Sequence, residues 1–224
     1  YRLHHECKND LPNLISRRQF NARRKLTARL AEEIRKDVAT SIDGGENVFC
    51  IDTKPVKVCQ NARAKRCAMG RDNPEAAPDW GYCASQRMYY YGYKLHAVCG
   101  ISGVIHSFDM TAASIHDLHY LKDVQWEYHD CMMLGDKGYL GTEVQQNLFD
   151  VANITLDIPY RLNQKNWRPP TWAYRKFRKR IETVFSQLDD SLMMIRNYAK
   201  QSCGLFTRME GKIAAMTFMQ YVNL

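Results

Sequence analysis

Three carboxylates occupy positions in this sequence that suit metal-dependent chemistry. Asp52 ends the apolar run VFCI, although aspartate is depleted in strands. Asp136 follows a second apolar run in the turn GDKG, and Glu182 lies in the helical segment RIETVFSQL. Each has an ordinary structural explanation on its own, as a strand end, a turn former and a helix-surface acid. Together they predict one shared site if the segments that carry them are neighbours.

Carboxylates that converge repel one another unless a cation lies between them. Oxygen ligands of this kind suit Mg²⁺ or Mn²⁺, which keep several waters and bind phosphate oxygens. Two such ions about 3.5–4 Å apart can activate an attacking oxygen and stabilise the leaving one in phosphoryl transfer. We therefore expect Asp52, Asp136 and Glu182 to be catalytic residues and metal ligands, with Mg²⁺ or Mn²⁺ as cofactor and two ions as the expected number.

Two further charged residues have more than one explanation. Arg178 precedes Glu182 by four residues, so a helix would place both on one face. It either forms an ordinary surface pair with Glu182, holds that carboxylate in place, or reaches a phosphate. Asp117 follows the third predicted strand and is either a fourth acid near the site or a stabilising charge at a helix N-terminus.

The elements that must position these residues alternate between strands and helices. Apolar and aromatic runs predict strands at 48–51, 88–100, 104–111, 131–134 and 154–159. Helical periodicity, with Ser16 and Ser114 as expected caps, predicts helices at 16–42, 114–126, 142–149, 181–195 and 205–222. Pro55 is expected to end the pairing of the first strand.

This order predicts an α/β fold, a mixed five-stranded sheet flanked by helices as in ribonuclease-H-like proteins. We expect a basic N-terminal helical arm at 1–45 and a catalytic domain of this fold at 46–224, with a long connector at 54–88. In such a layout the first and fourth strands are neighbours, and the helix of Glu182 packs across them. The three acids would then meet at one edge of the sheet.

The net charge of +8 is concentrated in two segments. Residues 161–180 hold eight basic and no acidic side chains, and residues 1–36 hold ten basic and four acidic ones. Such clusters attract polyanions, which favours nucleic acid as the partner over a solvated basic face without function. No apolar run approaches the ~20 residues that cross a membrane, and the arm lacks a clean amphipathic face, so we expect no membrane partner.

The sequence resembles bacterial insertion-sequence transposases of the DDE type from about Leu11 to the C-terminus. The motifs that carry the resemblance are FCIDTKPV followed by CQNARAKR, then YYYGYKLH, GDKGYLG and RIETVFSQL. The resemblance implies that Asp52, Asp136 and Glu182 form the catalytic triad. It also implies family counterparts for Cys59, Arg63, Arg66, Tyr93, Lys94 and His96.

One departure from the family's pattern concerns its Tyr-Arg-Glu-Lys signature. The arginine and the glutamate are present, but Tyr174 is one residue early and Asp189 stands in place of the lysine. The resemblance implies that this lysine grips transposon-end DNA. Lys179 or Lys200 is the expected substitute.

The expected partner is double-stranded DNA, at transposon ends and at the target. Basic residues would contact its backbone, and an indole in the segment 161–172 would either stack on an unpaired base or pack in the core. The residues expected to contact DNA are Arg17, Arg18, Arg23, Arg24, Arg63, Arg66, Lys94, Lys137, Arg161, Lys165, Trp167, Arg168, Arg175, Arg178 and Lys179.

Eight cysteines without a CxxC pair are too sparse for a disulfide scaffold and favour a reducing cytoplasm. The resemblance implies that this is a bacterial cytoplasm, with the protein at the nucleoid when it is bound to DNA. A zinc site built from three of them and a histidine is an open alternative, although the spacing fits no standard pattern. Its ligands would be Cys59, Cys67, Cys83 and His96. Because the chain begins at Tyr1, we also expect an upstream segment.

These expectations lead to a DNA transposase that works as a homodimer assembled on DNA. Water would attack the phosphodiester at the transposon end, and the freed 3′-hydroxyl would attack target DNA. The alternatives are a stand-alone nuclease of the same fold and a domesticated DNA-binding protein derived from a transposase. The second alternative would have no reason to keep three mutually repelling acids.

Overall fold

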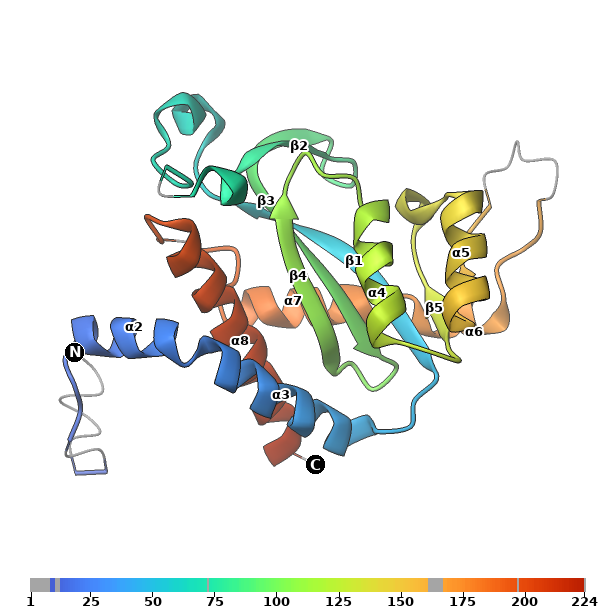
Figure 1. Cartoon of the computed structure of the whole chain (residues 1–224), viewed down its shortest axis with the longest axis horizontal. Helices are drawn as coiled ribbons and strands as arrows, with labels where there is room; N and C mark the ends of the chain where they lie inside the picture. Colours follow the sequence, from blue (N-terminus) through green and yellow to red (C-terminus); the bar gives the residue numbers. More distant parts are fainter. Residues whose placement is uncertain (1–8, 11–12, 72, 161–166, 197, 224) are drawn as a thin grey trace.

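A mixed β-sheet forms the centre of the computed structural model, which describes residues 9–10, 13–71, 73–160, 167–196 and 198–223 (Figure 1). The strands are β1 (Val48–Lys57), β2 (Asp79–Cys83), β3 (Met88–Gly100), β4 (Ile105–Ala112), β5 (Met132–Leu134) and β6 (Thr155–Asp157). β1 runs antiparallel to β3 and parallel to β5, and β5 runs parallel to β6. The five predicted strands lie in the order β4-β3-β1-β5-β6, which confirms the ribonuclease-H-like α/β fold class.

A sixth strand, β2, lies in the segment expected to be an irregular connector. β2 pairs antiparallel with the first five residues of β3, and β4 pairs with the remainder. Gly92 pairs with Lys57 on one side and with Asp79 on the other, so β2 lies on the edge of β3 opposite β1. The sequence DWGYC hides this strand because aspartate and glycine are both depleted in strands.

The prediction that Pro55 ends the pairing of β1 is wrong. Pro55 lies opposite Lys94 within the β1–β3 ladder. The N–H of Val58 points toward β3, where it donates to the carbonyl of Tyr91 at 3.1 Å. Backbone N–H groups alternate between the two edges of a strand, so the nitrogen of Pro55 faces the other edge. β5 pairs with β1 only as far as Cys50, and the missing N–H therefore costs no ladder hydrogen bond.

Helices cover both faces of the sheet. α7 (Arg180–Asp190) and α8 (Ser202–Val222) bury their apolar side chains against one face, together with Cys50 of β1. α4 (Leu118–Glu127) and α5 (Thr142–Ala152) pack against the other face, together with Ile51. Figure 1 shows α4 in front of the sheet and α7 behind it. No helix in the described part of the chain is long and apolar enough to span a membrane.

The predicted apolar stripe of α7 is confirmed over the helix itself, where Ile181, Val184, Phe185 and Leu188 are buried. α7 ends at Asp190, so Leu192 and Ile195 lie beyond it, and Ile195 is exposed. The shorter α6 (Trp172–Phe177) precedes α7 and is separated from it by two residues.

Two predicted helix boundaries need correction and one is confirmed. Ser16 caps its helix as predicted, accepting a hydrogen bond from the N–H of Gln19 while the Gln19 side chain accepts one from the N–H of Ser16. The long helix predicted after it divides at Thr27 into α2 (Arg17–Leu26) and α3 (Ala28–Asp43). Ser114 is not a helix cap, because a turn closed by the N–H of Ile115 comes first and α4 begins only after Asp117.

Arg35 fastens α3 to the edge of the sheet. Its guanidinium is fully buried and donates to both carboxylate oxygens of Glu32, at 2.7 and 2.6 Å. It also donates to the carbonyls of Ile105 and, at 2.7 Å, of His106 in β4. The apolar residues Phe20, Leu26, Leu30 and Ile34 of α2 and α3 are exposed, so α3 is held by this polar contact together with its packing around Ala39 and against α8.

We expect Arg35→Met to lower the free energy of unfolding by about 3–5 kcal/mol, because it leaves the Glu32 carboxylate and two carbonyls of β4 without this donor. Urea denaturation followed by circular dichroism would measure the change. Arg29→Met is the matched control, since Arg29 pairs with Glu33 on the same helix but is 93% exposed, and it should leave the stability unchanged. Equal effects of the two substitutions would contradict this assignment.

Candidate active site

The sheet brings Asp52 and Asp136 together because β1 is longer than β5. The last pair between these strands is Cys50↔Leu134, and each acid lies two residues beyond it. Burial raises the pKa of Asp52, and the nearby Asp136 carboxylate raises it further. Arg178 and the N–H of Thr53 oppose this rise, the latter by donating to Asp52 Oδ1 at 2.8 Å. Two of the three predicted acids are therefore electrostatic neighbours at the open edge of β1.

Arg178 connects Asp52 to the third acid. Its Nη2 donates to Asp52 Oδ2 at 2.9 Å, and its Nη1 lies 3.8 Å from Glu182 Oε1. Arg178 lies between α6 and α7 with its side chain only 9% exposed, whereas the side chain of Glu182 is 62% exposed. Burial lowers the pKa of Arg178, but the nearby Asp52 carboxylate raises it by more. The pKa of Arg178 is therefore above its ordinary value. The guanidinium is thus a fixed positive charge between two of the acids.

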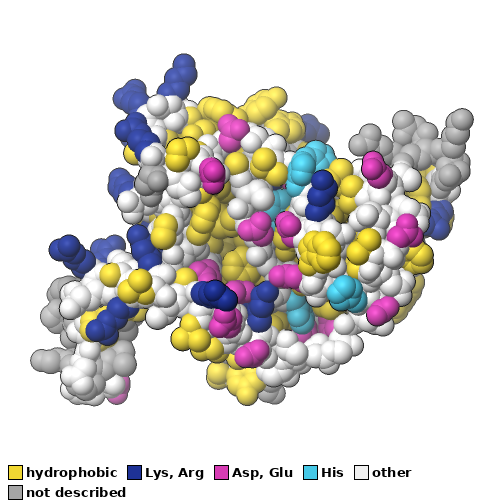
Figure 2. Space-filling model, in the orientation of Figure 1, with side chains coloured by type: hydrophobic (Ala, Val, Ile, Leu, Met, Phe, Trp, Pro, Cys, Tyr) yellow, Lys and Arg dark blue, Asp and Glu magenta, His cyan; other side chains and the backbone are white. Residues whose placement is uncertain are grey.

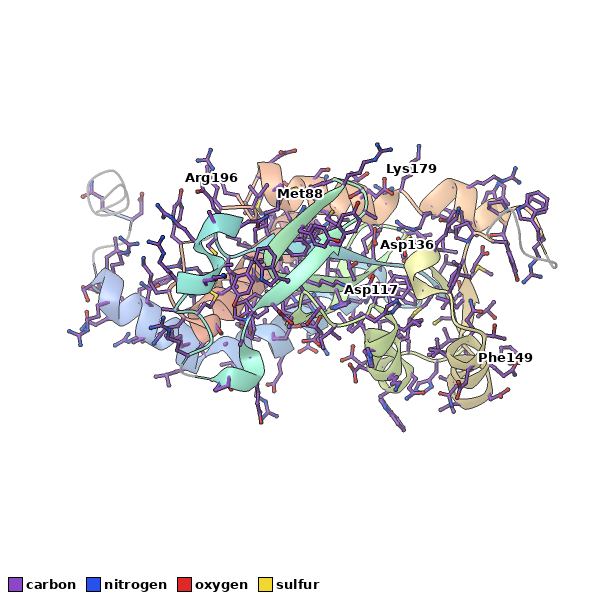
Figure 3. The ribbon with its side chains drawn as sticks, turned by 90° about the horizontal axis from the view of Figure 1, so that it is seen from above. Met88, Asp117, Asp136, Phe149, Lys179 and Arg196 are labelled. Atoms are coloured by element: carbon purple, nitrogen blue, oxygen red, sulfur yellow. The ribbon has the colours of Figure 1, made fainter. Side chains whose placement is uncertain are left out.

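Asp136 is held by the turn that follows β5. Its Oδ1 accepts a hydrogen bond from the N–H of Gly138 at 2.7 Å. A Cβ on Gly138 would lie 2.9 Å from that oxygen and 3.2 Å from Oδ2 of Asp117, so both carboxylates flank the glycine. Figure 3 shows the two aspartates in neighbouring positions. The glycine of GDKG therefore has a steric role, because a side chain there would displace one acid or the other.

Asp117 brings a fourth acid to this edge, from the opposite face of the sheet. Its Oδ1 accepts a hydrogen bond from Nζ of Lys94 at 2.9 Å. The hydroxyl of Tyr139 is fully buried and has no hydrogen-bond partner among the described residues. Burial raises the pKa of Tyr139 well above its ordinary value, and Asp52, Asp117 and Asp136 add to that rise. Tyr139 thus lies at the centre of the acidic group as a neutral phenol.

The residues fit a divalent cation by their chemistry, although the acids do not form a finished cage. The donors are carboxylate oxygens, the ligand type that Mg²⁺ and Mn²⁺ prefer. Within the described residues, no three His, Cys, Asp or Glu side chains are close enough together to hold an ion. Arg178 lies between Asp52 and Glu182, and its Nε and Nη1 have no hydrogen-bond partner there. The guanidinium already supplies positive charge to both carboxylates, so a metal ion bound by them would compete with Arg178.

Most of the residues expected to contact DNA are exposed. They are Arg17, Arg18, Arg23, Arg63, Arg66, Lys137, Trp167, Arg168, Arg175 and Lys179. Arg24 is half-buried beside Arg208 and Glu210 of α8, and Lys94 and Arg178 are engaged in the ion pairs above. Arg161 and Lys165 lie outside the described residues. Figure 2 shows acidic side chains near the middle of one face and basic side chains along its left and upper left margins.

Asp189, which departs from the family's pattern, has a specific partner. Lys54 Nζ lies 2.6 Å from Asp189 Oδ2, and both side chains are largely buried. Lys54 lies on β1 two residues after Asp52 and therefore on the same face of the sheet. A lysine therefore lies beside position 189, but it is Lys54 of β1 and not a residue of α7 as in the family's pattern. Sequence spacing did not predict it because 135 residues separate the two.

The zinc alternative is wrong for this chain. Cys59 and Cys67 contact each other, but Cys83 lies beside Ser85. His96 is buried and shares a hydrogen bond of 2.8 Å with the hydroxyl of Thr111. Burial lowers its pKa to about 4, so the ring is neutral and serves the core.

Comparison with known proteins gives one family. Residues 43–218 match the family described as "Transposase DDE domain". Similar solved structures are the catalytic domain of Mos1 mariner transposase and a Mos1 transposase paired-end complex with left transposon end, both 11% identical to this chain. The match to the catalytic domain covers 94% of this chain and 96% of that chain, with a TM-score of 0.29. The match to the paired-end complex covers 78% of this chain and 62% of that chain, with a TM-score of 0.28. No curated protein matches the sequence.

We expect Arg178→Met to lower the free energy of unfolding by about 2–4 kcal/mol at pH 7 without divalent ions, because it leaves the buried Asp52 charge uncompensated. The double variant with Asp52→Asn should recover at least about 1 kcal/mol relative to the sum of the single changes. Urea denaturation of all four proteins gives this coupling. Lys179→Met, an exposed neighbour, should have no effect, and additive free energies in the cycle would overturn the pairing.

Proposed function

The chain belongs to the Transposase DDE domain family, and on this premise we propose that Asp52, Asp136 and Glu182 are its catalytic triad. The proposed activity is hydrolysis of the phosphodiester at a transposon end, followed by transfer of the freed 3′-hydroxyl into target DNA. The observation that carries the proposal is the meeting of Asp52 and Asp136 at the open edge of β1, with Glu182 joined to Asp52 through Arg178.

Two bound Mg²⁺ or Mn²⁺ ions would supply the activation of the attacking oxygen and the stabilisation of the leaving one. The three triad carboxylates would hold these ions. Asp52 is the rigid member, because it lies in a central strand and is fixed by the N–H of Thr53. Glu182 is the exposed member, because its side chain is 62% exposed on the surface of α7.

In the first step, the oxygen of water forms a bond to phosphorus and the bond to the 3′-oxygen of the transposon end breaks. The 3′-oxygen leaves with a proton, and the flanking strand keeps the 5′-phosphate. In the second step, the 3′-hydroxyl loses its proton and attacks a phosphorus of the target strand, releasing a target 3′-hydroxyl. Both steps displace an alcohol from a phosphodiester, so one set of carboxylates serves both.

The proposed substrate is double-stranded DNA, held by the exposed basic residues around the site. Arg175, Lys176 and Lys179 lie on α6 and next to α7, immediately before Glu182, and would lie along the backbone near the reacting phosphate. Lys176 also lies over the ring of Trp172, with its Nζ 4.6 Å from the ring centre. Assembly as a homodimer on DNA is part of the proposal, because both transposon ends must be joined to one target.

A stand-alone nuclease of the same fold is the second candidate, because it would use the same triad for hydrolysis alone. A domesticated DNA-binding protein is the third, and the four acids kept at one edge argue against it. A strand-transfer assay with labelled transposon-end oligonucleotides separates the first two candidates. Cleavage without joining would identify the nuclease.

We expect Asp52→Asn, Asp136→Asn and Glu182→Gln each to lower metal-dependent plasmid nicking by at least about a hundredfold, since loss of a metal ligand removes several kcal/mol of transition-state stabilisation. The assay is nicking of supercoiled plasmid at low salt with Mg²⁺ or Mn²⁺, alongside gel-shift binding of duplex DNA. Asp190→Asn is the matched control, an exposed acid on the helix of Glu182, and should nick like the wild type. Nicking that survives all three triad substitutions would refute the site.

A further inference from the structure

Four aromatic side chains form an exposed face on the ribbon made by β2 and the start of β3. Trp80 lies opposite Tyr91 and Tyr82 lies opposite Tyr89 across the ladder. The ring centres of the first pair are 5.5 Å apart and those of the second 5.0 Å. Trp80, Tyr82 and Tyr89 remain 44%, 51% and 65% exposed, which is far more than a packing role requires. We call these four side chains the aromatic face.

The aromatic face lies on the same side of the sheet as the proposed catalytic acid Asp52. Side chains alternate along β3, so Tyr89 and Tyr91 point to the same side as Ala97. Ala97 is the residue directly opposite Asp52 in the β1–β3 ladder. Ala97 is six residues after Tyr91, which places the aromatic face roughly 20 Å along the strand from the acid.

Basic residues border the aromatic face. The 3₁₀ helix η1 (Asn61–Arg66) presents Arg63, Lys65 and Arg66 to solvent and is tied to the ribbon by a 2.9 Å hydrogen bond from Asn61 Nδ2 to the carbonyl of Tyr89. Arg87, in the turn that joins β2 to β3, is exposed as well. Figure 2 shows basic side chains at the upper left of the molecule, over this connector, with hydrophobic side chains beside them.

We propose that the aromatic face binds unpaired nucleotides of a DNA strand that leaves the active site, with the bases stacked on its rings and the phosphates held by η1. Aromatic rings stack on any base, and the energy of about 1–3 kcal/mol per base does not depend on sequence. The cations of η1 match the charge of a nucleic acid strand and would be costly to bury against another protein. The inference rests on the proposed transposase function, because a strand cut at a transposon end must separate from its complement before its nucleotides can stack on the rings.

The cross-strand ring pairs also have a structural role, since such pairs stabilise two-stranded ribbons. Substitutions must therefore separate stacking from folding. Trp80→Leu with Tyr89→Leu keeps apolar bulk on the ribbon but removes two flat rings. Trp80→Phe with Tyr89→Phe keeps the rings. Trp126→Leu is the control, since this lone indole on α4 is 74% exposed and far along the chain from the ribbon.

The test measures binding of the full chain to a labelled single-stranded oligonucleotide of mixed sequence, by fluorescence anisotropy, and to the matching duplex. The leucine pair should weaken single-strand binding about ten- to a hundredfold and duplex binding much less, while the phenylalanine pair and Trp126→Leu bind like the wild type. Wild-type protein should also form photocross-links between an iodouracil-substituted strand and the peptide 79–91. This second measurement needs no variant, so it decides the question even if the leucine pair fails to fold.

Unchanged single-strand binding by a folded leucine pair, or cross-links that avoid residues 79–91, would overturn the inference. A change in sedimenting mass without a change in single-strand binding would assign the aromatic face to a protein contact and would overturn it as well. These failures are distinct from failure of the proposed function. Asp136→Asn abolishes nicking but leaves the aromatic face intact, and the leucine pair leaves the triad intact.

Discussion

The site is organised around the charge of Asp52, which lies in a central strand with little access to water. Burial raises its pKa, and an ionised carboxylate in such a place needs a cation. Arg178 supplies it at 2.9 Å from a position 126 residues later in the chain. Because α7 begins two residues after Arg178, this contact and the buried apolar stripe of the helix together set where α7 crosses the sheet. Glu182 follows one turn after Arg178, and its carboxylate therefore lies on the same side of the helix, 3.8 Å from that guanidinium.

The open edge beside Asp52 exists because β5 has only three residues while β1 has ten. If β5 were longer, its backbone would cover the place where the acids meet. The turn after β5 instead carries Asp136, with a glycine that leaves room for two carboxylates, and then returns to the core through Tyr139. The short strand, the glycine and the buried tyrosine are therefore parts of one arrangement that keeps acids close together at an accessible edge.

Sequence alone predicted the elements that have strong periodicity or clear caps. The strand at 88–100 and the core stripe of α7 follow directly from their apolar patterns. The neighbouring positions of Asp52 and Asp136 were predictable because both residues follow apolar strands that the fold makes neighbours. Contacts between distant segments were not, since nothing local indicates that Lys54 meets Asp189. β2 also escaped prediction, because its aspartate and glycine are depleted in strands and interrupt the pattern set by its two aromatic residues.

Paired charges give the site its electrostatic character. Asp52, Asp117 and Asp189 each have a cation from another element, namely Arg178, Lys94 and Lys54. These pairs nearly cancel. The remaining negative charge comes from Asp136, which has no ion pair among the described residues, and from Glu182, whose carboxylate lies 3.8 Å from Nη1 of the already paired Arg178. Divalent ions would offset this local excess of negative charge at the proposed site, while the exposed Arg175, Lys176 and Lys179 beside Glu182 would attract the DNA backbone.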